Sequence, residues 1–212
     1  MTDHRSPGRM FLGRTVRPLI AICTAALGGC WSPQPAAPPM PARASVPSTR
    51  SDAAVDELLD LMRQRLNLMH DVARWKWNER KPIADPGRER QLLAALKRRG
   101  QAFGLSRRQS MTFMAAQIEA GKLIQEADFE SWTADSQGKF SDVRDLNSDL
   151  RPLIDELSDR LLARLAKLAP TLGQPQVKVH IEQQAENVIR GDGIDDVVRA
   201  AAVGPLLDDS LE

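Results

Sequence analysis

Apolar side chains recur three and four positions apart along much of this chain, which is the spacing of one face of an α-helix. In residues 51–79 the apolar members of this stripe are Leu58, Met62, Met69 and Val72. Similar stripes run through residues 111–132 and 154–168. Good helix formers dominate the composition, whereas β-branched residues are sparse. The sequence therefore predicts an all-α fold, a helical bundle with three long helices and shorter C-terminal helices.

Local capping signals indicate where these helices begin and end. Ser51 is the expected N-cap of the first helix, and Asp85 followed by Pro86 is a strong start signal for the second. The stretch Ser106-Arg-Arg-Gln109 has the form of a capping box and starts the third. Glycine and proline end the later helices, the last of them at Gly204-Pro205. The predicted helices span residues 51–79, 86–103, 106–134, 152–169, 176–190 and 194–203.

Residues 1–30 have the organisation of an export signal. Four arginines and a single acid occupy residues 1–17, and the apolar run that follows, 18–29, is too short to span a bilayer. The run ends in Leu27-Gly28-Gly29-Cys30, which resembles a bacterial lipobox, so we expect a lipid on Cys30 at the start of the mature chain. The alternative is ordinary cleavage near Ala42-Arg43-Ala44, which would release a soluble protein. Either route takes the protein out of the cytoplasm, into the periplasm.

The remainder of the chain divides into a tether and one domain. Six prolines among alanines and serines in residues 31–50 predict a disordered tether, which leaves residues 51–212 as the helical domain. That domain contains no cysteine, and its two histidines, His70 and His180, lie 110 positions apart, so neither a disulfide nor a metal site is expected. The net charge of +1 argues against nucleic-acid binding.

Polar residues interrupt the apolar stripes at positions that should face the core. Arg65 and Lys76 share the stripe of the first helix, within about 20° of the same direction and roughly 16 Å apart along the axis. In the third helix the interruption is Gln125, and Gly121 one turn earlier leaves room beside it. Two cations and an amide are therefore expected to point inward.

The other helices add charges of the same kind. Arg88 and Glu89 each lie one turn before a leucine of the second helix, and Arg151 lies at the beginning of the fourth. Residues 63–90 contain eight Lys or Arg against four Asp or Glu, so internal pairing would not satisfy every inward cation. Because burying an unpaired cation costs several kcal/mol, the pattern predicts a pocket for a small anion, such as a dicarboxylate.

Each of these positions also has an ordinary structural explanation. A single arginine on an apolar stripe often extends its guanidinium to solvent, and a buried glutamine is commonly a satisfied structural amide. The first helix is also amphipathic enough to lie on a membrane surface or to bind a partner. What favours a ligand is the coincidence of four cations and one amide, distributed over four helices, on core-facing stripes.

Three stretches together resemble a known family. They are Arg65-x10-Lys76, Pro82-Ile-x-Asp85-x2-Arg88-Glu89-x-Gln91-Leu-Leu93, and Gln117-Ile-Glu-Ala-Gly-Lys-Leu-Ile-Gln125. This spacing is similar to that of the all-helical, AroQ-type chorismate mutases. The export signal and the additional C-terminal helices resemble the secreted gamma subclass. The resemblance extends over about residues 55–132 and, more weakly, over 145–203.

The resemblance implies a role for each matching residue. Arg65, Arg88 and Arg151 match arginines that clamp the two substrate carboxylates. Lys76 and Gln125 match the pair that hydrogen-bonds the ether oxygen of the breaking bond, so that these two and Arg88 would be the catalytic residues.

The same resemblance extends to the rest of the substrate site. Asp85 and Glu89 match acids near the substrate hydroxyl, and Gly121 occupies a substrate-binding position where relatives usually carry a small hydroxyl residue. The implied reaction converts chorismate to prephenate, in aromatic amino acid biosynthesis, without a cofactor. The subclass also implies a homodimer in which one chain supplies a whole site. In that site Arg151 would replace the arginine that intracellular members take from a partner subunit.

Two other functions fit the same features. An isochorismate pyruvate lyase on this scaffold would also use a cationic dicarboxylate pocket. A non-catalytic periplasmic helical lipoprotein would instead direct its inward cations to solvent.

Overall fold

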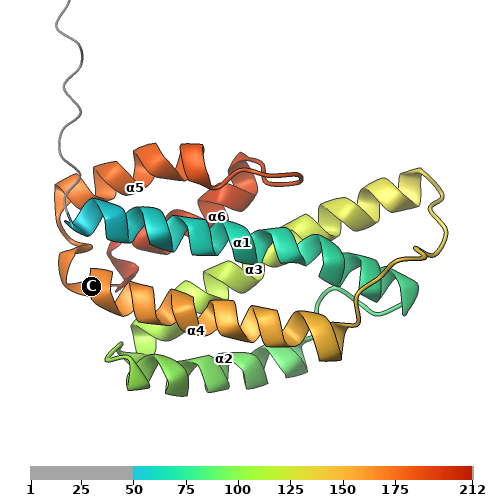
Figure 1. Ribbon diagram of the computed structural model, residues 1–212, viewed down its shortest axis with the longest axis horizontal. Helices are drawn as coiled ribbons and strands as arrows, with labels where there is room; N and C mark the ends of the chain where they lie inside the picture. The colour runs from blue at the N-terminus through green and yellow to red at the C-terminus, as the bar shows by residue number, and fades with distance from the viewer. Residues whose placement is uncertain (1–49, 212) are drawn as a thin grey trace, which may run out of the picture. The chain divides into compact units, whose positions relative to one another are not determined.

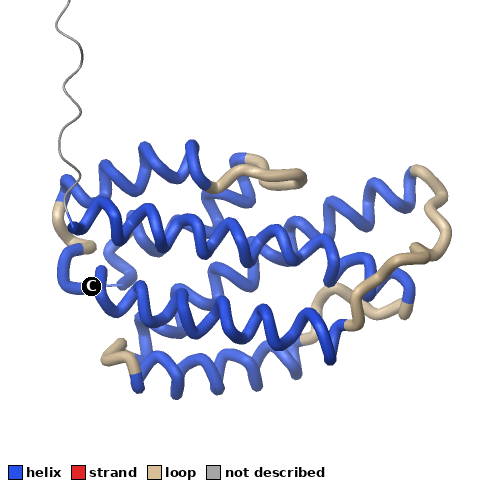
Figure 2. The backbone as a smooth tube through the Cα atoms, viewed as in Figure 1, coloured by secondary structure: helices blue, strands red, loops and turns tan. Residues whose placement is uncertain are grey.

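The computed structural model describes residues 50–211, which form helices, turns and loops without any strand (Figure 2). The α-helices of this part are α1 (Arg50–Asn78), α2 (Pro86–Ala102), α3 (Arg107–Ala134), α4 (Arg151–Leu168), α5 (Pro175–Val188) and α6 (Asp196–Leu207). They confirm the predicted all-α bundle. The predicted export signal with Cys30, and residues 31–49 of the predicted tether, lie outside the described residues. No helix within 50–211 is both long and apolar enough to span a bilayer.

The central helix of the bundle is α1, against which α3, α4 and α5 all pack (Figure 1). Helix α2 packs against α3 and α4, while α6 packs against α3 and α5. One continuous apolar core joins them, and its largest fully buried side chains include Leu59, Met62, Leu66, Phe113, Met114, Leu161 and Leu162. The long helices thus share one interior, into which their stripes project.

Two of the three predicted N-caps are confirmed. Asp85 caps α2 by accepting a hydrogen bond from the backbone N–H of Arg88, with Pro86 at the first helical position. Ser106 and Gln109 form the reciprocal capping box of α3. The predicted cap at Ser51 is wrong, because α1 already begins at Arg50.

The buried face of α3 is displaced from the stripe that the sequence predicted. Met111 was expected on the core face but is 37% exposed, whereas Ser110 is fully buried. The face is displaced because α3 packs against several partners along its length, namely α1, α2 and α6. The buried residues of α3 are Ser110, Phe113, Met114, Gln117, Ala120, Gly121, Ile124 and Gln125.

The predicted end of the last helix at Gly204-Pro205 is also wrong. Helix α6 continues through both residues to Leu207, although Pro205 has no N–H to donate to the preceding turn. Asp208 N still donates to Gly204 O at 3.0 Å, and Leu206 is only 1% exposed. Burial of this last turn in the core therefore outweighs one missing hydrogen bond.

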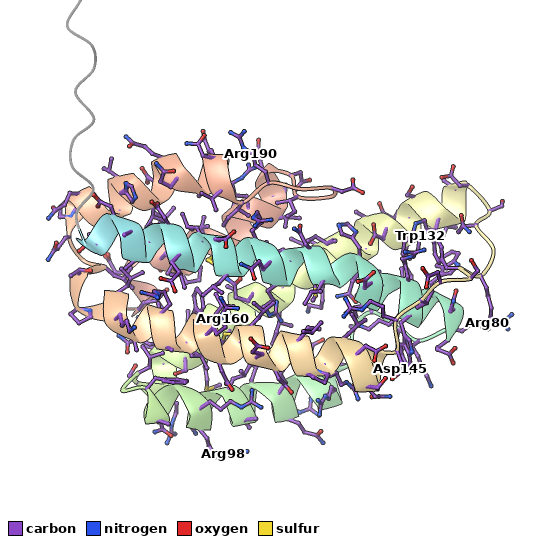
Figure 3. The ribbon with its side chains drawn as sticks, in the orientation of Figure 1. Arg80, Arg98, Trp132, Asp145, Arg160 and Arg190 are labelled. Atoms are coloured by element: carbon purple, nitrogen blue, oxygen red, sulfur yellow. The ribbon has the colours of Figure 1, made fainter. Side chains whose placement is uncertain are left out.

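The segment between α3 and α4 is held against the end of α1. Asn78 makes two hydrogen bonds with the backbone of Phe140, both at 2.9 Å. Asp145 then caps a single π-helical turn, Leu146–Leu150, which leads directly into α4. Figure 3 shows Asp145 beside the start of α4 and Trp132 near the far end of α3. The connection therefore determines where α4 begins and where its first residue, Arg151, lies.

A histidine connects three parts of the bundle. His70 of α1 contacts the Asp128 carboxylate of α3 through Nδ1 at 2.8 Å, and the Asp192 carbonyl between α5 and α6 through Nε2 at 2.9 Å. The hydrogen bond to Asp128 raises the pKa of His70 above its ordinary value of 6.5, although burial opposes the shift. The charged form of His70 is therefore stabilised by folding.

This raised pKa predicts a pH-dependent stability. The contribution of His70 is fully present below pH 6.5 and is lost as pH rises through the higher pKa of the folded state. We expect the melting temperature of wild type, measured by circular dichroism from pH 6 to 8.5, to fall relative to that of a His70→Gln variant. Asp128→Asn is the matched partner change and should remove the same difference. Parallel curves for wild type and both variants would contradict the assignment.

Candidate active site

A cavity of about 370 Å³ opens between α1, α2, α3 and the start of α4. This volume is in the range of small-molecule sites. Its walls contain most of the residues that the sequence singled out, namely Arg65, Lys76, Asp85, Arg88, Glu89, Gln125 and Arg151. Residues more than 80 positions apart in the chain therefore meet at one hollow.

Arg65 is the most deeply buried cation of the cavity. It is only 4% exposed, its Nη1 donates to the Gln117 carbonyl at 2.7 Å, and its buried Nε has no hydrogen-bond partner. Among residues 50–211 it forms no ion pair with any carboxylate. Burial lowers the pKa of Arg65 to about 10, so the guanidinium remains charged at neutral pH. A buried, charged and incompletely bonded guanidinium is suited to receiving an anion.

Lys76 and Gln125 meet across the interface of α1 and α3. Lys76 Nζ donates to Gln125 Oε1 at 2.9 Å and to the Ile83 carbonyl at 2.8 Å. Burial lowers the pKa of Lys76 from the ordinary lysine value, and the neighbouring carboxylates of Glu89 and Asp85 oppose that shift. The ammonium is thus fixed at the cavity wall by two neutral acceptors, neither of which offsets its charge.

The Gln125 amide has a definite orientation. Its Nε2 donates to the Gly121 carbonyl one turn earlier, at 2.9 Å, and lies 3.8 Å from Met69 Sδ. The oxygen of the amide therefore faces Lys76, and the nitrogen faces its own helix. Gln125 donates to a ligand only if this amide turns.

The first turn of α2 contributes Asp85, Arg88 and Glu89. Asp85 accepts from Arg88 N at 2.9 Å, and Glu89 Oε1 accepts from Asp85 N at 3.3 Å. Asp85 and Arg88 are exposed and Glu89 is half-buried, so these three residues lie at the mouth of the cavity. The sequence predicted Asp85 as the helix cap, but not that Glu89 also accepts a hydrogen bond from the backbone N–H of Asp85.

Arg151 reaches the cavity from the first residue of α4. It is half-buried, and its Nη1 donates to Asn147 Oδ1 within the π-helical turn. That hydrogen bond leaves the rest of the guanidinium available on the cavity side. The Asp145 cap and the turn after it therefore position this arginine.

Gly121, which the sequence analysis expects at a substrate-binding position, is not among the residues that line the cavity. A Cβ at this position would lie 2.9 Å from Met69 Sδ and 3.8 Å from Arg65 Nη1. Space for a side chain is thus already filled by Met69, because α1 and α3 approach closely here. Gly121 acts on the site through its carbonyl, which holds the Gln125 amide.

Lys122 is a cavity residue that the sequence analysis missed. Its Nζ lies 2.7 Å from Glu119 and 3.7 Å from Glu89, and the hydrogen bond to Glu119 raises its pKa. Lys122 follows Ile118 by four positions and precedes Gln125 by three, so helical spacing does place it on the cavity face. Lysine on a helix is usually solvated, which is why the pattern alone did not single it out.

The cavity wall as a whole carries an excess of positive charge. Six of its residues are cationic, namely Arg65, Lys76, Lys81, Arg88, Lys122 and Arg151, and three are acidic, namely Asp85, Glu89 and Asp155. Asp155 also forms an ion pair with Arg99, with 3.5 Å between Asp155 Oδ1 and Arg99 Nη1. Three net positive charges in a partly enclosed hollow favour a small dianion.

Comparison with known proteins agrees with this geometry. The family described as chorismate mutase type II matches residues 49–126. The crystal structure of chorismate mutase from Burkholderia thailandensis is 34% identical, with a TM-score of 0.67, over 73% of this chain and 99% of that one. The secreted chorismate mutase of Mycobacterium tuberculosis is 26% identical over 73% of this chain and 78% of its own length. The secreted chorismate mutase of Mycolicibacterium smegmatis is 27% identical over 86% of this chain and 94% of its own length. The chain therefore belongs to the type II (AroQ) family of chorismate mutases.

Proposed function

We propose that this chorismate mutase converts chorismate to prephenate in the cavity between α1, α2, α3 and α4. The observation that carries the proposal is Arg65, a charged and buried guanidinium without a carboxylate partner in residues 50–211. A substrate carboxylate would complete its hydrogen bonds and offset its charge. Arg88 and Arg151, at the mouth and at the start of α4, would hold the second carboxylate.

The arginines accelerate the reaction by restricting the substrate. The rearrangement has one substrate and requires its flexible side chain to fold over the ring. Contacts from α1, α2 and α4 to two carboxylates would hold that compact conformer. Because these helices pack on a common core, the backbone positions that carry the three arginines are held at fixed separations.

Lys76 supplies the electrostatic stabilisation. Negative charge develops on the ether oxygen as the C–O bond breaks, and a single donor placed there is typically worth about 3–4 kcal/mol. Lys76 Nζ is held by Gln125 and the Ile83 carbonyl before any substrate binds, so the ammonium is already at the cavity wall. Gln125 becomes the second donor when its amide turns from Gly121 toward the ether oxygen; this turn breaks its hydrogen bond with Lys76 and leaves the Ile83 carbonyl to hold the ammonium. Asp85 and Glu89 are within the same wall and would accept from the substrate hydroxyl.

We further propose that the enzyme works outside the cytoplasm, either lipid-anchored through Cys30 or released, and as a homodimer. The N-terminal sequence supports export. The relatives from M. tuberculosis and M. smegmatis are named secreted chorismate mutases, which is consistent with such a location.

The central test of this function is Lys76→Ala. Loss of the charged donor should lower kcat/KM for chorismate by about 100-fold or more, measured by loss of chorismate absorbance, with helical circular dichroism unchanged. The control is Lys167→Ala, at an exposed position of α4, which should leave kcat/KM unchanged. Isochorismate assayed in parallel separates this function from the lyase. Wild-type turnover in Lys76→Ala would refute the proposed role.

Arg65→Met separates function from stability. Removing a buried cation that lacks a charged partner should leave the melting temperature unchanged or raise it, since an apolar chain of similar volume replaces a poorly solvated charge. The same change should lower kcat/KM by about 100-fold or more, because a carboxylate loses its buried partner. A fall in melting temperature as large as that of a core truncation such as Phe113→Ala would show that Arg65 is mainly structural.

The pH dependence tests Gln125 and Lys76 together. A neutral amide donates at any pH, so kcat/KM should be nearly flat from about pH 5 to 8. At higher pH, activity should begin to fall before the pH reaches 10.5, the ordinary lysine pKa, because burial lowers the pKa of Lys76. Burial also lowers the pKa of Arg65, to about 10. A Gln125→Glu variant should instead lose activity as pH rises, since its carboxyl must stay protonated to donate. A steep fall of the wild-type profile between pH 5 and 8 would argue against Gln125 as a donor.

A further inference from the structure

A second hollow, of about 670 Å³, adjoins the active site at the end of α1 and α3. It lies where the segment after α3 passes the end of α1. Figure 3 shows Arg80 and Trp132 at this end of the bundle. Its charged lining consists of Lys76, Arg80, Lys81 and Lys139, and its aromatic lining of Trp77 and Phe129.

The lining of this hollow is basic. Within residues 50–211, no acidic residue lines it. Arg80, Lys81 and Lys139 are exposed, and none forms an ion pair within residues 50–211. Arg80 adopts a left-handed backbone conformation (φ 52°) just after the end of α1, where its N–H donates to the Trp77 carbonyl at 3.2 Å. Several uncompensated cations around one concave surface favour an anion.

The aromatic side of the hollow is held in place by its neighbours. The Trp77 ring packs edge-to-face on Phe129, with ring centroids 5.2 Å apart, and on Trp132 at 5.6 Å. Trp77 Nε1 donates to the Gly138 carbonyl at 3.2 Å, which ties the ring to the segment that carries Lys139. Two fixed rings beside the cations provide an apolar surface for a planar ring.

We propose that this hollow binds a small aromatic carboxylate, with its ring against Trp77 and Phe129 and its carboxylate among Arg80, Lys81 and Lys139. A simple inorganic anion would use the cations but leave the aromatic surface without a partner. An uncharged aromatic compound would do the reverse. An aromatic carboxylate satisfies both parts of the lining.

Binding here would be coupled to the active site. Lys76, Lys81 and Pro82 line both hollows, and the Ile83 carbonyl that follows them accepts from Lys76 Nζ. An anion bound in the second hollow would reduce the positive electrostatic potential at Lys76 and Lys81, and this potential attracts the substrate to the active site. The bound aromatic carboxylate therefore weakens chorismate binding, and chorismate weakens its binding by the same factor. Only this coupling rests on the proposed role of Lys76.

Binding itself is tested by calorimetry with 3-phenylpropionate as the probe, on the intact mature chain. We expect saturable binding to wild type, and affinity weaker by about tenfold or more in Arg80→Glu/Lys139→Glu. The matched control is Arg98→Glu/Lys167→Glu, two exposed charge reversals away from both hollows, which should bind the probe as wild type does. Figure 3 shows Arg98 on the outer side of α2. Arg65→Met, which alters only the main cavity, should also retain the probe.

Two comparison ligands test the chemistry of the site. 3-Cyclohexylpropionate keeps the carboxylate but loses the planar ring, and inorganic phosphate loses the organic part altogether; both should bind several-fold more weakly. The proposal is overturned if phosphate binds as tightly as 3-phenylpropionate, or if the probe fails to saturate wild type at millimolar concentration. Equal affinity in wild type and Arg80→Glu/Lys139→Glu would also overturn it.

Coupling is measured separately, by steady-state kinetics. The probe should raise the KM for chorismate in wild type and in the Arg98→Glu/Lys167→Glu control, but not in Arg80→Glu/Lys139→Glu, whose kcat without the probe should be close to wild type. A probe that binds as predicted but leaves KM unchanged refutes the coupling. A chain without mutase activity that still binds the probe refutes the proposed function instead.

Discussion

The site depends on keeping one guanidinium charged in the interior. Arg65 lies among apolar residues of α1 and α3, where it is only 4% exposed and no carboxylate of residues 50–211 pairs with it. A folded protein tolerates such a group only if the rest of the core compensates for its desolvation. The continuous apolar core shared by all six described helices provides that compensation. The buried charge of Arg65 therefore lowers the stability of the bundle, while it favours the binding of an anion in the cavity.

A helix end amplifies the positive field of the cavity. The first turn of α2 borders it through Arg88, near the positive end of that helix dipole, whereas Arg151 follows a π-helical turn that leads directly into α4. Asp85 offsets part of this field at α2, where it caps the helix. The last turn of α1 contributes Lys76, a cation at the negative end of its own helix. Cationic side chains and a helix dipole thus act on the same small volume.

The segment between α3 and α4 serves the active site from a distance. Asn78 and Trp77, next to Lys76 in sequence, hold Phe140 and Gly138 of this segment. The same segment then leads through the Asp145 cap to Arg151. Two cations of the site, on α1 and α4, are therefore fixed relative to each other through a polar and aromatic contact outside the cavity. The second hollow forms at this same junction, which is why its occupancy is expected to reach Lys76.

The sequence by itself determined the helices and most of the charged residues that line the cavity. Period and capping residues placed the helix boundaries within a few positions, and cations on the stripes identified Arg65 and Lys76, because these signals are local and strong. Tertiary structure decided the rest. It extended α6 past Pro205, filled the space beside Gly121 with Met69, turned the Gln125 amide toward Lys76, and brought Lys122 to Glu89. Each of these outcomes depends on the side chains that another helix places against that point. The local sequence of one helix does not specify which side chains of a distant helix will pack against it.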